Sequence, residues 1–271
     1  MTTATEWNFE GVNDTIVACA WPAPADGATF LAVLVHGYGE HIGRYDHVAA
    51  SLSSIGGAVY GLDHLGHGKS GGDRVLIANF EDVVEDVHTV VETARAAYPG
   101  LPTVLVGHSM GGMIGARYAQ LHGDVLDAVV LSGAAVGSFD LINMLLSLDE
   151  IPDIPLDPSI LSRDDAVGEA YATDELVWHG PFKRPTLQGF ADTIAAIEAS
   201  GSLGHLPLLW LHGQDDQLVP IEGTRQGMAK LRGDTFRERT YPGARHEVFN
   251  ETNRNEVLTD VNEFIVDSLD L

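Results

Sequence analysis

Residues 107–111 read GHSMG and match the pattern G-x-S-x-G, in which a serine hydroxyl serves as a nucleophile. The apolar run 102–107 (PTVLVG) predicts a strand before the motif, and the apolar spacing of the residues after the motif predicts a helix. The two glycines allow the strand and the helix to approach closely around a strained turn. Such a turn holds the serine hydroxyl outward at a helix N-terminus, where the dipole favours an oxyanion. We therefore predict that Ser109 is a nucleophile.

A serine hydroxyl needs a base to remove its proton, and the base needs an acid to orient it. In strand–turn–helix sites of this kind, the acid and then the histidine follow the serine along the chain. The late run 206–216 (LPLLWLHGQDD) ends in Asp215 and Asp216, and the run YPGARH ends in His246. His212 is a rival base, but it precedes both acids, which is the wrong order. The residues alone therefore predict His246 as the base and leave the acid as Asp215 or Asp216.

The loop after the first long apolar run reads HGYG over residues 36–39. An oxyanion hole takes one backbone N–H from such a loop and one from the residue after the nucleophile, which predicts Tyr38 and Met110 as the donors. The glycines of this loop also begin a dinucleotide-binding pattern. That pattern, G-x-G-x-x-G, needs a third glycine where Ile42 stands, so we expect no cofactor.

Several histidines lie close together in sequence, at His41, His47, His64 and His67. Their spacing matches neither H-E-x-x-H nor H-x-H-x-D-H, and His246 has no second histidine in register. We expect no metal site, and we expect His67 to shape a loop beside the active site.

Short apolar runs alternate with helical patterns along most of the chain, which predicts a mostly parallel sheet covered by helices on both faces. A helix of about 80–98 follows the capping residue Asn79, and a last helix begins near residue 251. We expect an α/β fold with an eight-stranded sheet. Its strands are expected at residues 6–9, 15–20, 29–36, 57–62, 102–107, 126–132, 206–212 and 234–241.

The stretch 137–205 breaks this alternation, so we predict a core of residues 1–136 and 206–271 with an inserted cap, or lid, of residues 137–205. Two apolar helices are expected in the insertion, around 141–146 and 187–197. An apolar lid is suited to an acyl chain. The candidates to line an acyl tunnel, or to contact a lipid surface, are Leu141, Ile142, Leu145, Leu146, Phe190 and Ile194.

The composition excludes some partners. A formal net charge of −24 over 271 residues repels the phosphates of nucleic acids, so we expect no nucleic acid partner. The single cysteine, Cys19, cannot form an intrachain disulfide. The N-terminus lacks the basic and apolar regions of a signal peptide, and no apolar run reaches the length of a membrane helix. We expect a cytoplasmic or peripherally membrane-associated protein, with no indication of its oligomeric state.

Longer segments resemble the monoacylglycerol lipases, the bacterial ones especially, within the α/β-hydrolase superfamily. The segments are HGYGEHIGRYDHVAASL (36–52), GLDHLGHGKSGG (61–72), GHSMGG (107–112), LHGQDDQLVPIEG (211–223) and YPGARHEVFNE (241–251), together with AYATDELVWHG (170–180) in the insertion. The resemblance implies Ser109 as nucleophile, His246 as base and Asp216, not Asp215, as acid. It also implies Tyr38 and Met110 as the oxyanion donors.

The resemblance further implies substrate-binding residues. Glu40 and Arg44, in the HGxGEHxxRY segment, are similar to a polar framework near the glycerol end, although a surface salt bridge would give the same pattern. Tyr171 corresponds to a residue that can contact glycerol, although simple packing would account for it equally well. Besides the resemblance, His108 beside the nucleophile is a further candidate, and the apolar spacing of the insertion gives Leu145, Phe190 and Ile194 for the acyl chain. Leu65 departs from the family, which usually has arginine there, and we expect this change to affect a loop contact only.

The expected reaction is hydrolysis of a monoacylglycerol to glycerol and a fatty acid through an acyl-enzyme. Alternatives on the same scaffold are a lysophospholipase, a diacylglycerol lipase or a general carboxylesterase. A ligand-binding protein on a non-catalytic hydrolase fold is more remote, since the nucleophile, acid and base are all present. Epoxide hydrolases and dehalogenases use aspartate where this chain has Ser109.

Overall fold

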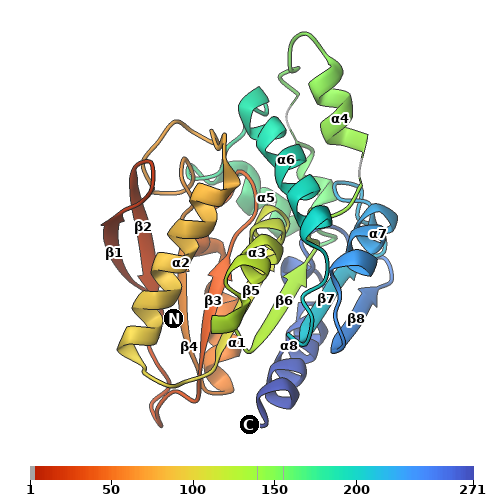
Figure 1. Ribbon diagram of the computed structural model, residues 1–271. Helices are drawn as coiled ribbons and strands as arrows, with labels where there is room; N and C mark the ends of the chain where they lie inside the picture. Colours follow the sequence, from red (N-terminus) through yellow and green to blue (C-terminus); the bar gives the residue numbers. More distant parts are fainter. Residues whose placement is uncertain (1–3, 139, 155) are drawn as a thin grey trace.

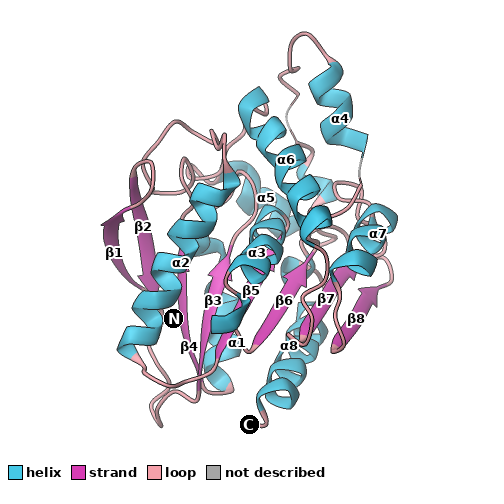
Figure 2. Ribbon diagram, viewed as in Figure 1, coloured by secondary structure: helices cyan, strands magenta, loops and turns pink. Residues whose placement is uncertain are grey.

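An eight-stranded sheet runs through the centre of the molecule, with helices packed on both of its faces (Figures 1 and 2). The computed structural model describes residues 4–138, 140–154 and 156–271. The strand order is β1-β2-β4-β3-β5-β6-β7-β8. The pairings of β2 with β1 and with β4 are antiparallel, and the other pairings are parallel. The α/β-hydrolase fold predicted from the sequence is confirmed.

The strands begin and end within two residues of their predicted bounds. The opening hairpin consists of β1 (Thr5–Glu10) and β2 (Thr15–Ala20). The remaining strands are β3 (Phe30–Val35), β4 (Gly57–Leu62), β5 (Thr103–His108), β6 (Ala128–Ser132), β7 (Leu208–Gly213) and β8 (Phe236–Tyr241).

The central strands are apolar throughout because both of their faces are covered. In β3, Leu31 and Val33 pack into one hydrophobic cluster, whereas Ala32 and Leu34 pack into a second cluster on the opposite face. Successive side chains of a strand point to opposite faces, so a strand buried on both sides needs an unbroken apolar run. This explains why the Val- and Leu-rich runs could be recognised as strands.

Helices α2 (Phe80–Ala97), α3 (Met110–Leu121) and α7 (Ile221–Leu231) contribute to the first cluster, and α1 (Asp46–Ser54) and α8 (Arg254–Leu269) contribute to the second. The side chain of Asn79 caps α2 by accepting a hydrogen bond from the Glu81 N–H (3.2 Å), as predicted. Helix α8 begins about three residues later than predicted, and a short 3-10 turn at residues 248–250 precedes it. Other 3-10 turns are Ile42–Tyr45, Gly123–Val125 and Pro158–Ile160.

Three helices lie in the chain between β6 and β7: α4 (Asp140–Ser147), α5 (Asp165–Thr173) and α6 (Arg184–Ser200). We call residues 137–205 the cap segment. Helices α4 and α6 are the two predicted from apolar spacing, whereas α5 was not predicted. Helix α4 lies at the outer end of the cap segment, far from the sheet (Figure 1). No helix in the described ranges is long and apolar enough to cross a membrane.

The chain order reverses between β3 and β5, which are neighbours in the sheet. From β3 the chain passes to β4 on one side, and it then returns to β5 on the other side. In open α/β sheets, ligands bind outside the carboxyl ends of the strands at such a switch point. The predicted nucleophile and the HGYG loop both follow these two strands, so the topology brings them together.

Candidate active site

Ser109 occupies a strained turn between β5 and α3. Its backbone has φ 54° and ψ −116°, a conformation that side-chain-bearing residues rarely adopt. A Cβ at Gly107 would collide with the carbonyl oxygen of Gly111, and a Cβ at Gly111 would collide with the carbonyl oxygen of Val35. The glycines of the motif are therefore required by this close approach of strand, turn and helix.

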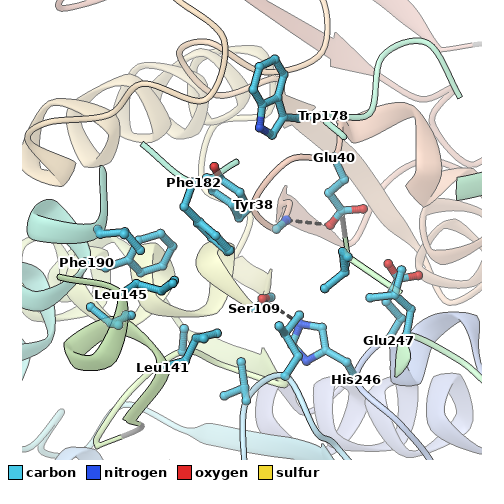
Figure 3. A pocket seen from close by; sticks show the side chains of 18 of the residues that line it. Tyr38, Glu40, Ser109, Leu141, Leu145, Trp178, Phe182, Phe190, His246 and Glu247 are labelled. Carbon is cyan, nitrogen blue, oxygen red and sulfur yellow. Dashed lines mark hydrogen bonds between the residues drawn. The ribbon is translucent and has the colours of Figure 1, made fainter. Parts of the chain in front are cut away.

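The three predicted triad residues meet at this turn. His246 Nε2 lies 2.8 Å from Ser109 Oγ (Figure 3). On the other side of the ring, His246 Nδ1 lies 2.7 Å from Asp216 Oδ2. All three side chains are buried, whereas Asp215 is exposed. His212, the rival base, contacts the acid and not the serine, with its Nε2 3.2 Å from Asp216 Oδ2. Of the candidates, Asp216 and His246 are therefore the ones that the fold brings into line with Ser109.

The charges of the site favour a protonatable His246. Burial alone lowers the pKa of the imidazole, but the Asp216 carboxylate outweighs burial and raises the pKa of His246 above its ordinary value. Burial opposes ionisation of Asp216 as well, yet His246 and His212 together hold the pKa of Asp216 well below its usual range. The carboxylate is thus ionised wherever the histidine acts as a base.

Two backbone N–H groups lie where an oxyanion hole is predicted. Met110 is the first residue of α3, directly after Ser109, and Tyr38 follows the carboxyl end of β3. Neither N–H donates a hydrogen bond to another group in the described part of the chain. Tyr38 also lines the cavity above Ser109, so its loop is next to the place where a substrate carbonyl would lie.

A buried network of charges lies behind the site. Glu40 Oε1 accepts hydrogen bonds from the Gly37 N–H (2.7 Å) and the Tyr45 hydroxyl (2.7 Å), and Glu40 Oε2 accepts one from Arg44. Arg44 also donates two hydrogen bonds to Glu247, of 2.8 and 2.7 Å. Because these side chains are at most one-ninth exposed, the surface salt bridge considered from the sequence is wrong.

The charged groups of this network stabilise one another in their ionised forms. Burial tends to raise the pKa of Glu40, but Arg44 outweighs burial and the pKa of Glu40 is lowered. The two carboxylates in turn raise the pKa of Arg44 despite its own burial. Since Glu40 also binds the Gly37 N–H, the network fixes the start of the loop that carries Tyr38.

A cavity opens above Ser109 and differs in character between its two ends. Figure 3 places Leu141, Leu145 and Phe190 to one side of Ser109, and Glu40 and Glu247 to the other side. Ile142, Leu187, Tyr171 and His179 also line the cavity. One end is therefore suited to an alkyl group and the other to a polar group.

His108 lines the cavity beside Ser109. Its ring centre lies 4.9 Å from that of His246, and its Nδ1 lies 3.2 Å from Ser132 Oγ. Burial and the neighbouring His246 lower the pKa of His108 to about 4. His108 is consequently neutral when His246 is the working base.

Comparisons with known proteins bear on the identity of this site. Residues 28–253 match the family described as Hydrolase_4, serine aminopeptidase, S33. The monoacylglycerol lipase of Mycolicibacterium smegmatis is 37% identical over 277 residues, which cover 98% of this chain and 99% of that protein. This chain belongs to the monoacylglycerol lipase family. The resemblance seen in the sequence motifs is confirmed.

Solved structures support membership of the monoacylglycerol lipase family. The monoacylglycerol lipase of Paleococcus ferrophilus is 28% identical and superimposes with a TM-score of 0.79, covering 93% of this chain and 99% of that one. A thermostable carboxyl esterase from Bacillus coagulans, solved in complex with glycerol, is 26% identical with a TM-score of 0.84, covering 99% of this chain and 100% of that one.

The predicted substrate-binding residues of this lipase-family chain fall into two groups. Glu40, His108, Tyr171, Leu145 and Phe190 line the cavity. Arg44, Leu146 and Ile194 do not, among the residues the structure describes. Arg44 lies behind Glu40, with its guanidinium 5.3 Å from the centre of the Tyr171 ring. Leu146 and Ile194 pack half-buried against the main hydrophobic cluster.

Sequence reasoning missed part of the cavity wall in this family member. Phe182 stacks on Tyr38 with ring centres 4.6 Å apart, and Trp178 lines the cavity nearby. The backbone N–H of Trp178 donates a hydrogen bond to the Gly39 carbonyl (2.7 Å), which joins the cap segment to the HGYG loop. Trp178 stands in the AYATDELVWHG segment, which could have identified it. Leu65, the departure from the family, is buried in the main hydrophobic cluster.

Proposed function

We propose that this protein hydrolyses the ester bond of monoacylglycerols to glycerol and a free fatty acid, with Ser109, Asp216 and His246 as its catalytic triad. The observation that carries the proposal is the position of Ser109. Its hydroxyl is hydrogen-bonded to His246 (2.8 Å) at the junction between an apolar cavity wall and a polar one. A single-chain fatty ester of glycerol has an apolar and a polar part joined at the reacting carbonyl.

In the proposed reaction, His246 takes the Ser109 proton on Nε2 as Oγ attacks the ester carbonyl. Asp216 holds the Nδ1–H tautomer and stabilises the imidazolium. The N–H groups of Tyr38 and Met110 stabilise the negative oxygen of the tetrahedral intermediate. His246 then protonates the leaving glycerol, and a water molecule attacks the acyl-enzyme with His246 again as base, which releases the fatty acid.

The acyl chain is placed along the apolar wall formed by α4 and α6. Each methylene group transferred from water contributes about 0.8 kcal/mol, so a long chain gains much more from this wall than a short one. Leu145 of α4 and Phe190 of α6 are proposed as the main contacts of the acyl chain. We expect a preference for medium or long chains over acetate esters.

The glycerol group is placed toward Glu40, Glu247 and Tyr171. Free carboxylate lone pairs accept hydrogen bonds from hydroxyl groups, and the Tyr171 hydroxyl can donate or accept one. The esterase from Bacillus coagulans was solved with glycerol bound, which supports an alcohol-binding end in this fold. The network around Arg44 would keep the Glu40 carboxylate ionised during turnover.

We further propose that the cap segment contacts a lipid surface and that substrate passes from this surface into the cavity. Met144, Leu148 and Ile154 are large apolar side chains that are 53%, 40% and 72% exposed, and Ile154 also lines the cavity. Ile154 is therefore both exposed on the cap segment and part of the cavity lining. Its neighbours Asp149, Glu150 and Asp153 repel anionic lipid, so a neutral surface is the expected partner.

The proposal is tested by initial rates on monoacylglycerols of short, medium and long chains. Diacylglycerol, triacylglycerol, a lysophospholipid and an aminoacyl amide are measured in parallel, because the family description includes an aminopeptidase. The Ser109→Ala protein is the blank. Fastest turnover of a monoacylglycerol supports the proposal, whereas a faster lysophospholipid or amide contradicts it. If none of the esters is hydrolysed in a way that depends on Ser109, the triad assignment is overturned as well.

A further inference from the structure

We infer that His212 is a positioning residue for the catalytic acid: with Trp210, it holds Oδ2 of the Asp216 carboxylate in place for its hydrogen bond with His246 Nδ1. The inference rests on the triad proposed above and adds a fourth side chain to it. His212 takes no part in the mechanism as derived so far, although it is completely buried.

The two oxygens of Asp216 are held differently. Oδ1 accepts two backbone hydrogen bonds, from the N–H groups of Leu218 and Val219, both of 2.9 Å. Two donors on one oxygen fix its position but leave the carboxylate able to pivot about it. Oδ2, which accepts from His246 Nδ1 (2.7 Å), is the oxygen that must not move. Its other contact is His212 Nε2, at 3.2 Å.

The tautomer of His212 is fixed from both sides of its ring. The indole N–H of Trp210 can only donate a hydrogen bond, and it lies 3.2 Å from His212 Nδ1, so Nδ1 is the acceptor. Nε2 faces two acceptors, the Val219 carbonyl (2.9 Å) and Asp216 Oδ2. Nε2 therefore carries the proton. It donates this proton to the Val219 carbonyl, and the same N–H edge of the ring lies 3.2 Å from Asp216 Oδ2.

The sequence positions explain how one strand builds this support. Trp210 and His212 are two residues apart in β7, so their side chains point to the same face of the sheet. Asp216 follows four residues after His212, in the turn after the strand. The side chain of Trp210 is fully buried, which holds the donor in place. A rigid strand thus orients a catalytic group that itself lies on a loop.

The contact has a consequence for the base. The N–H of His212 takes part of the negative charge of Oδ2 that would otherwise act on His246 alone. Loss of this N–H should raise the apparent pKa of the base while leaving the carboxylate less well oriented. The other ionisable groups that act on His246 lie elsewhere and are left unchanged by substitution of His212: His108, Glu40 and Glu247, together with Arg44 between the two glutamates.

The experiment compares His212→Leu and His212→Gln with a control, Leu211→Val, on a soluble monoester. Leu211 is equally buried in β7 but lies in the cluster on the opposite face, so the control makes a cavity without touching Asp216. We expect His212→Leu to lower kcat by about 10-fold or more, the effect of losing one N–H group beside a charged oxygen, with little change in KM. Its acidic limb in the kcat/KM profile should move to higher pH.

The glutamine variant retains an N–H donor and should recover part of kcat and return the limb toward that of the unmodified enzyme. An unmoved limb in His212→Leu, with a loss no larger than in Leu211→Val, overturns the inference, as does a glutamine variant as slow as the leucine variant. These outcomes presuppose an active parent enzyme, so they differ from a failure of the proposed function, in which the parent itself has no ester turnover.

A measurement on the unmodified protein guards against variants that do not fold. In ¹⁵N-histidine NMR spectra, His212 should show a protonated Nε2 and an unprotonated Nδ1, with a slowly exchanging N–H proton. An Nδ1–H tautomer or a rapidly exchanging ring would contradict the assignment.

Discussion

Arg44 and Glu247 form a two-bond ion pair across 203 residues of sequence, with Nη1–Oε1 and Nη2–Oε2 distances of 2.8 and 2.7 Å. Glu247 is the residue directly after the proposed base His246, and Arg44 follows the loop that carries Tyr38. The pair therefore ties the base to the oxyanion loop. Glu40 binds the same guanidinium and extends this link to the Gly37 N–H.

Removal of the cation from this network should be strongly destabilising. In Arg44→Met, two buried carboxylates are left without their partner, and loss of one member of a buried ion pair costs about 3–5 kcal/mol in free energy of unfolding. The matched control is Arg95→Met, which breaks a more exposed pair with Glu92 and should cost about 0–1 kcal/mol. Urea denaturation measures both, and equal losses would contradict the buried network.

The acid assignment predicts a large difference between two neighbouring aspartates. Asp216→Asn should lower kcat by about 10⁴-fold, because the amide no longer fixes the tautomer of His246 or stabilises its imidazolium. Asp215→Asn removes the same charge from an exposed side chain and should leave kcat within about twofold. Steady-state kinetics on a soluble ester decide the matter, and the reverse pattern would make Asp215 the acid.

Much of this arrangement could be predicted from the sequence, because its signals are local. The unbroken apolar run of β3 follows from burial on both faces. The glycines around Ser109 are required by the elbow, and the chain order of the triad identifies His246. Each of these features depends on a short segment of sequence, in which spacing and residue type constrain the backbone directly.

Other features could not be predicted, since they depend on contacts between distant segments. Helix α5 was missed because Tyr171 is its one buried residue, which leaves no apolar stripe to recognise. Local residue spacing does not indicate long-range contacts such as the pairing of Arg44 with Glu247. The same is true of the stacking of Phe182 on Tyr38. The apolar spacing of α6 suggested that Ile194 lines the tunnel, but spacing identifies a buried face without saying what that face contacts.

The pH dependence of turnover follows from the raised pKa of His246. The base must be unprotonated, so kcat/KM should rise with pH through an apparent pKa above about 6.5, the ordinary value for histidine, and then level off. In Asp216→Asn the residual activity should have its limb at lower pH, because the carboxylate that raises the pKa is gone. A limb for the unmodified protein well below pH 6.5 would contradict the ion pair.

Chain-length preference should depend on the apolar cavity wall. Leu145→Arg places a charge among the residues proposed to contact the acyl chain, and it should lower kcat/KM for long-chain monoesters about tenfold more than for short-chain ones. Met144→Arg adds the same charge one residue away at an exposed position, and it should leave this ratio unchanged for substrates in true solution. Equal losses on short and long esters in Leu145→Arg would contradict the tunnel.

Contact of the cap tip with lipid should be separable from the chemistry. The double variant Met144→Asp, Leu148→Asp should sediment less with neutral phosphatidylcholine vesicles while retaining its turnover of a soluble short-chain ester, because both side chains are exposed and neither is part of the cavity lining. The unmodified protein should bind anionic vesicles more weakly than neutral ones, given its net charge of −24. Stronger binding to anionic vesicles, or unchanged binding by the variant, would contradict this role for α4.

The most direct test of the whole account is the rate of fatty acid release from a medium- or long-chain monoacylglycerol, measured beside diacylglycerol, triacylglycerol, lysophospholipid and aminoacyl amide substrates. The account predicts that the monoacylglycerol is hydrolysed fastest and that Ser109→Ala lowers its kcat by about 10⁶-fold. Faster release from any of the other substrates, or release that persists in Ser109→Ala, would contradict it.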